Sequence, residues 1–435
     1  MIDDFKRPFK KSGQRQTKID PQIFRPDQQE IESASEPTLS PMTNISTNTP
    51  ELPKPVESVD AAIRSASDTA NTNDKPLKKR RQPFWHDWSK KKKIISAVIL
   101  ALIVLGGSAV AAWALTRSEP VQPVVKKTVK KVVPPPVYYS NLSGLKITDP
   151  AINDRPVTGV MIENSPNSRP QSGIDQAGIV FEAIAEGGIT RFLTLYQDTQ
   201  PEYLGPVRSA RPYYVQWARG YDAGYAHVGG SPEALANIKA WGIKDLDQFY
   251  NSGAYQRISS RSAPHNVYTS LPTLLQLQQT KGWTKSTFTG FERKEDTPSK
   301  TPNAAKIDIA ISSGLYNSHY DYDVATNSYK RSQGGAPHTV VNKDGSQLQL
   351  TPKVVAALVT TYGIQADGKH SEYNVIGSGS GVIFQDGIAT TVTWKKDSLE
   401  GPLTFIDAQG KPFKINRGQT WITVVANTSK IAYTP

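Results

Sequence analysis

The chain of 435 residues contains no cysteine. This absence excludes disulfide bonds, thiol nucleophiles, thiolate metal sites and an anchor made of a lipid-modified cysteine. Long apolar runs are also scarce. The sequence has one uncharged apolar stretch of membrane-spanning length, the 22 residues from Ile94 to Leu115. Membrane attachment is therefore expected to depend on this one segment.

The segment Ile94 to Leu115 has the length of a single membrane crossing. As a helix it would be roughly 33 Å long, close to the roughly 30 Å of a bilayer's hydrocarbon core. The twenty residues before it carry nine lysines and arginines and the twenty after it carry five, so the positive-inside rule predicts a cytoplasmic N-terminus and an extracytoplasmic C-terminal region. A cleaved signal peptide is the alternative because Ala109 to Ala111 resembles a cleavage site, but the run is long and begins late, which favours an uncleaved anchor.

The net charge of +12 is unevenly placed. Residues 1–93 contribute +5, residues 116–140 contribute +4 and residues 141–435 contribute only +3. Most of the basic charge therefore flanks the apolar segment, where anionic lipid head groups would attract it. A nucleic-acid partner is not expected.

Composition divides the rest of the chain. Residues 1–93 are polar and predicted to be a disordered cytoplasmic tail, and residues 116–140 are rich in proline and lysine, which is typical of a stiff stalk. Residues 141–435 have a globular pattern and are too many for one ordinary core. A polar stretch from Lys294 to Asn303 therefore predicts a boundary between a first domain, 141–298, and a second domain, 299–435.

The overall fold class predicted is α+β, with an α/β-layer first domain and a mostly β second domain. In the first domain, helices are expected to begin at Ser231 and Ser270, each followed by a proline within two residues. The predicted strands are Val157–Ile162, Ile179–Glu186 and Arg191–Tyr196. In the second domain, β-branched runs alternate with turns at Asp344-Gly345, Asp386-Gly387 and Gln409-Gly410.

Polar residues around a predicted hairpin suggest a site. With Gly187-Gly188 as the turn, Glu186 is expected opposite Ile189, Ile184 opposite Arg191 and Glu182 opposite Leu193. Arg191 is then expected to lie on one face between Glu182 and Glu186. This arrangement is either a salt-bridged patch that fixes the hairpin or the polar floor of a ligand cleft. Two carboxylates four residues apart on a strand are too distant for a glycosidase pair.

Further candidate ligand-binding residues follow along the chain. Arg208 and Arg211 could hold a carboxylate or phosphate, or could only cross-link loops. His227 precedes Gly229-Gly230-Ser231, a helix start that could bind an anion. His265 and Asn266 could serve in acid–base chemistry or hydrogen bonding, although a loop histidine is often structural. No catalytic signature, cofactor site or metal site is expected.

Several motifs together resemble the YerB-like family of bacterial envelope proteins, whose function is unknown. In the first domain they are Arg169 to Gly173, Glu186 to Phe192, Gly205 to Arg211, His227 to Ser231 and Pro264 to Asn266; in the second they are Gly377 to Gly381, Asp386-Gly387, Trp394 and Gly418 to Ile422. The resemblance covers roughly residues 150 to 430 and implies a two-domain extracytoplasmic module. Because the function of the family is unknown, no catalytic residue can be carried over from it.

The chain departs from that family pattern in two ways. Many relatives resemble lipoproteins, whereas this chain has no cysteine. Relatives also tend to have an acidic residue soon after the motif matching Pro337-His338, where this chain has Thr339 to Asn342. An acid-dependent or metal-binding role of that segment is therefore not supported.

Three functions follow as hypotheses. The leading one is a membrane-anchored, non-enzymatic protein that binds a cell-wall or surface ligand outside the cell. The second is an envelope hydrolase or transferase acting on an anionic polymer, with Arg208 and Arg211 as the anion clamp and His227 or His265 as the acid–base group. The third is a transmembrane sensor that uses the N-terminal tail. The oligomeric state is not predictable.

Overall fold

The computed structural model describes residues 89–116 and 136–435. The predicted tail, apart from residues 89–93, and most of the predicted stalk lie outside these residues. The chain divides into two units, residues 1–125 and residues 126–435. In the first unit a single helix, α1 (Lys90–Thr116), includes the whole apolar segment and has no buried residue. It is long and apolar enough to cross a membrane.

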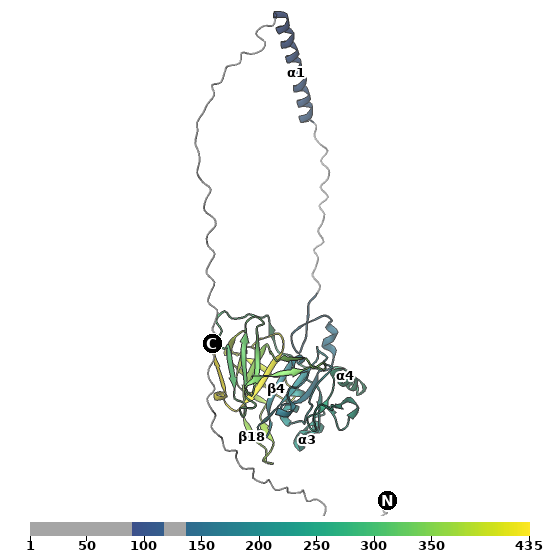
Figure 1. The fold of residues 1–435 in the computed structure, drawn as a ribbon, viewed down its shortest axis with the longest axis vertical. Coiled ribbons are helices and arrows are strands. Elements are labelled where there is room, and N and C mark those ends of the chain that lie inside the picture. Colours follow the sequence, from purple (N-terminus) through teal and green to yellow (C-terminus); the bar gives the residue numbers. More distant parts are fainter. Residues whose placement is uncertain (1–88, 117–135) are drawn as a thin grey trace, which may run out of the picture. The chain divides into compact units, whose positions relative to one another are not determined.

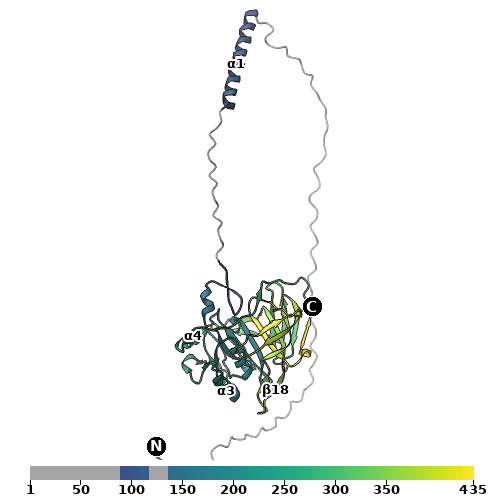
Figure 2. The ribbon, with the colours of Figure 1, turned by 180° about the vertical axis from the view of Figure 1, so that it is seen from behind.

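A mixed sheet of ten strands dominates the second unit (Figures 1 and 2). Its order is β22-β21-β20-β17-β24-β4-β5-β3-β6-β7. The bounds in that order are Thr404–Ile406, Ile388–Lys396, Gly377–Gln385, Val354–Val359, Thr420–Val425, Ile179–Glu186, Ile189–Tyr196, Thr158–Glu163, Gly224–His227 and Lys244–Asp247. Parallel pairs join β17 to β24, β24 to β4, β3 to β6 and β6 to β7, and the other neighbours are antiparallel.

The sheet continues across the predicted domain boundary, because β24 of the C-terminal segment pairs with β4 of the N-terminal segment. The polar stretch that was expected to be a linker is itself tied to the C-terminal segment. Lys294 is the register partner of Asn416 in a short parallel strand pair, and the amide of Ser299 donates to the carbonyl of Asp386. The two segments therefore do not have separate cores.

The two faces of the sheet are covered by different elements. Helices α2 (Pro212–Arg219) and α3 (Pro232–Ala240) pack on one face, through Trp217 and Ile238 among others. Helix α4 (Leu271–Thr280) packs on the other through Leu271 and Leu274. That face also receives a five-stranded sheet of β14 (Ala336–Pro337), β13 (Ser328–Gln333), β12 (Ser318–Asp323), β11 (Lys306–Ile309) and β25 (Ile431–Thr434).

Local sequence signals account for many of these boundaries. Ser231 and Ser270 are the N-caps of α3 and α4, and each side-chain oxygen accepts a backbone N–H three residues later. Asp386-Gly387 forms the turn between β20 and β21, with both residues at positive φ. The α+β class and the mostly β C-terminal segment are confirmed.

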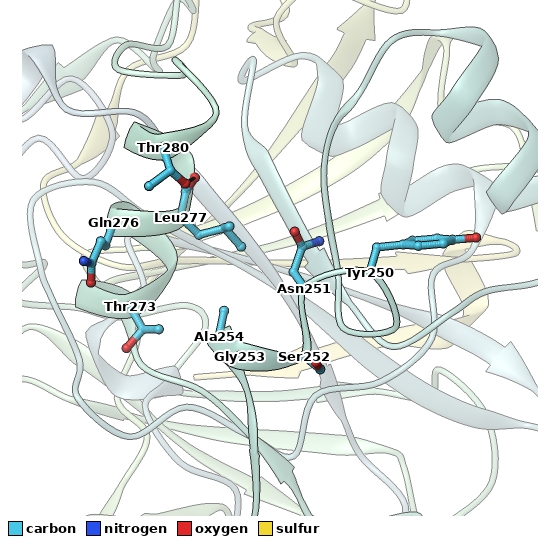
Figure 3. Close-up of a pocket in the computed structure, with 9 residues that line it drawn as sticks. All are labelled: Tyr250, Asn251, Ser252, Gly253, Ala254, Thr273, Gln276, Leu277 and Thr280. Atoms are coloured by element: carbon cyan, nitrogen blue, oxygen red, sulfur yellow. Dashed lines mark hydrogen bonds between the residues drawn. The ribbon is translucent and has the colours of Figure 1, made fainter.

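A surface hollow of about 450 Å³ opens between α4 and the turn that contains the short 3₁₀ helix η4 (Ser252–Ala254). Figure 3 shows Leu277 directed into this space from α4 and Asn251 facing it from the turn, whereas the ring of Tyr250 extends away on the other side.

Candidate functional site

The β4–β5 hairpin turns at Gly187-Gly188, whose φ values of +54° and +77° suit a two-residue turn. Glu186 is opposite Ile189, as predicted, and its Oε1 lies 2.5 Å from Nη2 of Arg191. The turn and the Glu186–Arg191 ion pair are therefore present.

A β-bulge between Ile184 and Glu186 shifts the register of the pairs from Ile184 back to the start of β4. Arg191 faces Ala183 and Glu182 faces Phe192, each one residue away from the predicted partner. Because successive side chains of a strand alternate between faces, Glu182 lies on the face opposite to Arg191. The predicted grouping of Glu182 with Arg191 was wrong.

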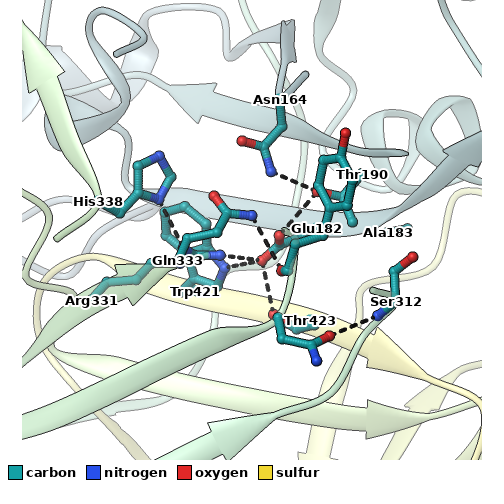
Figure 4. Close-up of polar contacts among 12 residues, drawn as sticks. Asn164, Glu182, Ala183, Thr190, Ser312, Arg331, Gln333, His338, Trp421 and Thr423 are labelled. Carbon is teal, nitrogen blue, oxygen red and sulfur yellow. Dashed lines mark hydrogen bonds and ion pairs between the residues drawn. The ribbon is translucent and has the colours of Figure 1, made fainter. Parts of the chain in front are cut away.

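Glu182 is instead the centre of a buried polar network (Figure 4). Its carboxylate accepts hydrogen bonds from Nη2 of Arg331 at 2.8 Å, from Nε1 of Trp421 at 2.9 Å and from Oγ1 of Thr190 at 3.2 Å. Both members of the Glu182–Arg331 ion pair have 0% side-chain exposure. Glu182 therefore cannot contact a ligand in this conformation, contrary to its selection as a candidate site residue.

The network continues through His338, whose ring has a defined tautomer. Nη1 of Arg331 lies 2.8 Å from Nδ1 of His338, and Nε2 of His338 lies 3.0 Å from Oε1 of Gln171. Since arginine can only donate, Nδ1 is the acceptor and Nε2 carries the proton. Burial, and then the charge of Arg331, hold the pKa of His338 well below its usual value.

The network also closes on itself. Nε2 of Gln171 donates to Oδ1 of Asn164 at 3.0 Å, and Nδ2 of Asn164 donates to Oγ1 of Thr190 at 2.6 Å. Thr190 in turn donates to Glu182. This closed circuit of hydrogen bonds joins residues of the N-terminal segment to Arg331 and His338 of the C-terminal segment, so it links the two segments.

A first cluster of charge lies at the hairpin end of the sheet. Arg211 forms an ion pair with Oε2 of Glu186, so the single carboxylate of Glu186 contacts both Arg191 and Arg211. Both arginines are 3% exposed, and burial lowers the pKa of each. Nε2 of His370, from a C-terminal loop, lies 3.9 Å from the same carboxylate. Arg211 is thus engaged within the protein and is not a free anion clamp.

A second cluster forms around Glu163, at the end of β3. Its buried carboxylate lies 3.3 Å from Nε of Arg208 and 3.0 Å from Nδ1 of His265. Oγ of Ser165 donates to Oε1 at 2.9 Å. Glu163 was not selected from the sequence, although three polar residues in a row after a buried apolar strand (Glu163 to Ser165) were a usable signal.

The outer ends of Arg208 and His265 are available. Their side chains are 21% and 20% exposed. Within the described part of the chain, the two terminal nitrogens of Arg208 have no hydrogen-bond partner, and Nε2 of His265 has none either. If Nδ1 of His265 donates to Glu163, Nε2 keeps a lone pair that faces outward.

Ser165 does not complete a serine-hydrolase triad. Its Oγ lies 3.4 Å from Nδ1 of His265, the same ring nitrogen that faces Glu163. A triad requires the serine and the acid at opposite nitrogens of the imidazole. A nucleophilic role for Ser165 is therefore not supported by this geometry.

The two clusters are neighbours across the sheet. Glu163 and Arg191 are register partners on β3 and β5, and Nη1 of Arg191 donates to the carbonyl of Ser209 at 3.0 Å, beside Arg208. We call the combined set the arginine edge. It consists of Glu163, Glu186, Arg191, Arg208, Arg211 and His265, which are all predicted candidates except Glu163.

His227 does not belong to this group. It has 0% side-chain exposure, its Nδ1 lies 2.8 Å from the carbonyl of Gly229, and its Nε2 lies 3.1 Å from Oδ1 of Asp245. The expected anion site at the helix start is also occupied, because the amide of Gly229 donates to Oδ1 of Asp247 at 2.9 Å. The suggested acid–base role of His227 and the anion site were therefore wrong, because oxygen atoms of the protein itself already lie at both ring nitrogens of His227 and at the amide of Gly229.

Asn266 is adjacent to His265 in sequence but has a different partner. Its Oδ1 accepts from Nη1 of Arg257 at 2.7 Å, beside the short strand pair that joins the exposed Gln256-Arg257 to the buried Val267-Tyr268. Its side chain forms no hydrogen bond with the arginine edge within the described residues.

Comparison with known proteins agrees with this architecture. Residues 142–284 match the N-terminal domain, and residues 307–422 the C-terminal domain, of a family described as protein of unknown function DUF3048. The chain belongs to this family. It is 30% identical over 305 residues to the protein named "Putative lipoprotein YerB" of Bacillus subtilis, covering 69% of this chain and 88% of that protein. The crystal structure of Bacillus subtilis YerB matches with a TM-score of 0.61 at 27% identity, covering 68% of this chain and all of that one.

Proposed function

We propose that the chain is a single-pass membrane protein that presents residues 136–435 outside the cell. Helix α1 has the length and apolar character of a membrane span, and the greater number of basic residues before it favours a cytoplasmic N-terminus. The curated relative is named a lipoprotein, and a lipid anchor of that kind needs a cysteine, which this chain lacks. In this proposal α1 takes the place of the lipid.

We infer that the arginine edge binds an anionic cell-wall or surface ligand. The observation that carries this inference is the state of Arg208, whose Nε faces Glu163 while its two terminal nitrogens have no partner in the described residues. A guanidinium held in this way presents a fixed pair of donors, which matches the oxygen atoms of a phosphate or carboxylate. His265, held by the same carboxylate, supplies a second polar contact.

The test uses the full-length protein in lipid nanodiscs and isolated bacterial cell walls, either intact or stripped of their anionic polymers. Intact walls are expected to retain the protein and stripped walls are not. Arg208→Gln removes one charge-assisted interaction, so retention should require about tenfold more wall material. Arg219→Gln is the matched control, because Arg219 is 27% exposed and pairs with Glu400 at 3.5 Å on another part of the surface. Equal retention by stripped walls, or unchanged binding of Arg208→Gln, contradicts the proposal.

The pairing of His265 with Glu163 favours a second function, acid–base catalysis on the same ligand. A carboxylate at Nδ1 orients the ring and favours the tautomer in which Nε2 can accept a proton. This is the hydrolase or transferase hypothesis with His265, oriented by Glu163, as the acid–base group and with Arg208 alone as the anion clamp. It predicts release of soluble fragments from intact walls by the wild-type protein, loss of that release in His265→Gln, and retained wall binding by this variant. Absence of release by the wild-type protein on intact walls rules it out.

A further inference from the structure

A buried carboxylate, that of Asp386, contacts a lysine and two asparagines at the polar stretch between the two segments. Its Oδ2 accepts a hydrogen bond from Nζ of Lys294 at 2.5 Å. Its Oδ1 accepts from Nδ2 of Asn416 at 2.6 Å and from Nδ2 of Asn327 at 2.8 Å. An amine, a carboxylate and a carboxamide therefore meet in one site.

The backbone places Lys294 beside Asn416. The short strands β10 (Arg293–Lys294) and β23 (Ile415–Asn416) are parallel, and Lys294 is the register partner of Asn416. Side chains of register partners project from the same face of a strand pair. Because both side chains also bind the carboxylate of Asp386, the amine nitrogen of Lys294 lies close to the carboxamide of Asn416.

The carboxamide of Asn416 is the less constrained of the two. Asn416 is 0% exposed, yet its Oδ1 has no hydrogen-bond partner within the described residues. A buried acceptor without a partner is unusual and calls for an explanation. Oδ1 of Asn327, in contrast, accepts from the hydroxyl of Tyr322 at 2.7 Å. The carboxamide of Asn327 is therefore held at both ends, whereas that of Asn416 is held only at its nitrogen.

We propose that Lys294 and Asn416 form an intramolecular amide cross-link, with Asp386 as the proton carrier. Nζ of Lys294 attacks Cγ of Asn416, an amide bond forms between these two atoms, and the bond from Cγ to Nδ2 breaks. Nζ gives up two protons, which pass through the carboxylate of Asp386 to the departing nitrogen. That nitrogen leaves as ammonium and Asp386 returns to its charged form, so no oxidant or further reactant is needed.

The ion pair between Lys294 and Asp386 sets the rate of this reaction. Although burial raises the pKa of Asp386, hydrogen bonds from Lys294, Asn327 and Asn416 lower it to about 2. A charged ammonium has no lone pair, so attack requires prior transfer of a proton from Nζ to the carboxylate. The neutral pair is a minor form, and cross-linking is therefore expected to be slow. The fixed proximity of the groups offsets this, because groups held together in one site react at very high effective concentration.

The cross-link ties the C-terminal segment to the stretch that precedes it. Lys294 follows the N-terminal segment, and Asn416 lies shortly before β24, the strand that pairs with β4. The bond closes a loop that contains most of the C-terminal segment. Like a disulfide, such a covalent tie restricts the unfolded chain, and this chain has no cysteine. The inference uses no residue of the arginine edge and does not depend on the functions proposed above.

The test is intact-mass spectrometry of the full-length protein, purified in detergent and incubated for several days at neutral pH. The mass is expected to be about 17 Da below that calculated from the sequence, the mass of one ammonia. Tryptic digestion should then yield a joined peptide that contains both Lys294 and Asn416. This mapping is needed because succinimide formation at any asparagine also releases ammonia.

Variants assign the roles of the groups. Lys294→Arg and Asp386→Asn should yield no joined peptide, since the first removes the nucleophilic amine and the second removes the proton carrier. Lys353→Arg is the matched control and should cross-link as the wild-type protein does. Lys353 is 29% exposed and pairs with Asp296 at 2.8 Å, but that carboxylate binds no carboxamide among the described residues.

The wild-type protein alone can refute the proposal, whether or not the variants fold. The proposal is overturned if the incubated wild-type protein keeps its full mass, or if its digest contains no joined peptide. A joined peptide with Asn327 in place of Asn416 also overturns it. So does a loss of about 18 Da, the mass of water, because that marks direct condensation of Lys294 with Asp386.

Discussion

The neutral imidazole of His338 makes a quantitative prediction about stability and pH. His338 is 4% exposed, and its only ring nitrogen without a proton already accepts a hydrogen bond from Arg331 at 2.8 Å. Protonation would break that bond and place two cations side by side in the core. Its pKa in the folded protein is therefore well below the value of about 6.5 expected in the unfolded chain.

The sign and size of the effect follow from that difference. As the pH falls below about 6.5 the unfolded chain binds a proton at this histidine and the folded protein does not, so the free energy of unfolding decreases. The decrease is about 1.4 kcal/mol per pH unit, which amounts to about 2 kcal/mol between pH 7 and pH 5. Substitution by glutamine can keep both hydrogen bonds, because its amide has an acceptor for Arg331 and a donor for Gln171.

The assay is urea unfolding of the full-length protein and of His338→Gln in detergent micelles, followed by tryptophan fluorescence at pH 7, 6 and 5. The wild-type protein should lose about 2 kcal/mol more than His338→Gln between pH 7 and pH 5. His319→Gln is a control of opposite sign. Although desolvation lowers the pKa of His319, Asp308 and Asp321 outweigh it and raise that pKa. Replacing His319 therefore removes a contribution to stability that is present at low pH and is lost as the pH rises through this pKa. Equal pH dependence of the wild-type protein and His338→Gln would refute the reasoning.

Three further substitutions test other parts of the structure in the same unfolding assay. Arg331→Met leaves the carboxylate of Glu182 buried without its cation and should cost about 3 to 5 kcal/mol. Adding Glu182→Gln to this variant should recover part of the lost stability. Full stability of the single variant would contradict the buried ion pair. Lys396→Met removes the ammonium that donates to the carbonyls of Ser398, Leu399 and Gly401 at 2.5 to 2.9 Å and should cost about 1 to 3 kcal/mol; unchanged stability would contradict the contribution of these hydrogen bonds. Gly187→Ala forces a side chain into a φ of +54° and should cost about 1 to 2 kcal/mol, although nothing obstructs the new Cβ. Gly314→Ala is equally unobstructed and has no positive φ, so it should cost much less. Equal losses of stability in the two variants would show that the turn conformation is not the cause.

Local features of the fold were predictable because they depend on neighbouring residues. The helix starts at Ser231 and Ser270 follow from N-capping, and the hairpin at Gly187 follows from the need for positive φ. The pairing of β24 with β4 was not predictable, since it joins strands more than two hundred residues apart and neither segment contains a local signal for it. Two separate cores were therefore expected, whereas the ten-stranded sheet runs through both segments.

The candidate site was predictable in part for the same reason. Arg208 and His265 were found as polar residues in loops next to strands, and the structure places both on Glu163. Glu182 was misplaced because a single bulged residue reverses which face a side chain occupies. The nearly continuous apolar run of a strand that is buried on both faces does not reveal such a bulge. His227 was misjudged because its partners, Asp245 and the carbonyl of Gly229, come from a neighbouring strand and a turn.

The position of β24 has a consequence for how the chain is made. This strand lies between β17 and β4 but leaves the ribosome after both of them. Until it is in place, β4 and β17 each have an unpaired edge, and such edges are sites of aggregation. A chain that ends before Thr420 would therefore consist of two incomplete half-sheets, so stable folding of this unit has to wait until β24 has been synthesised.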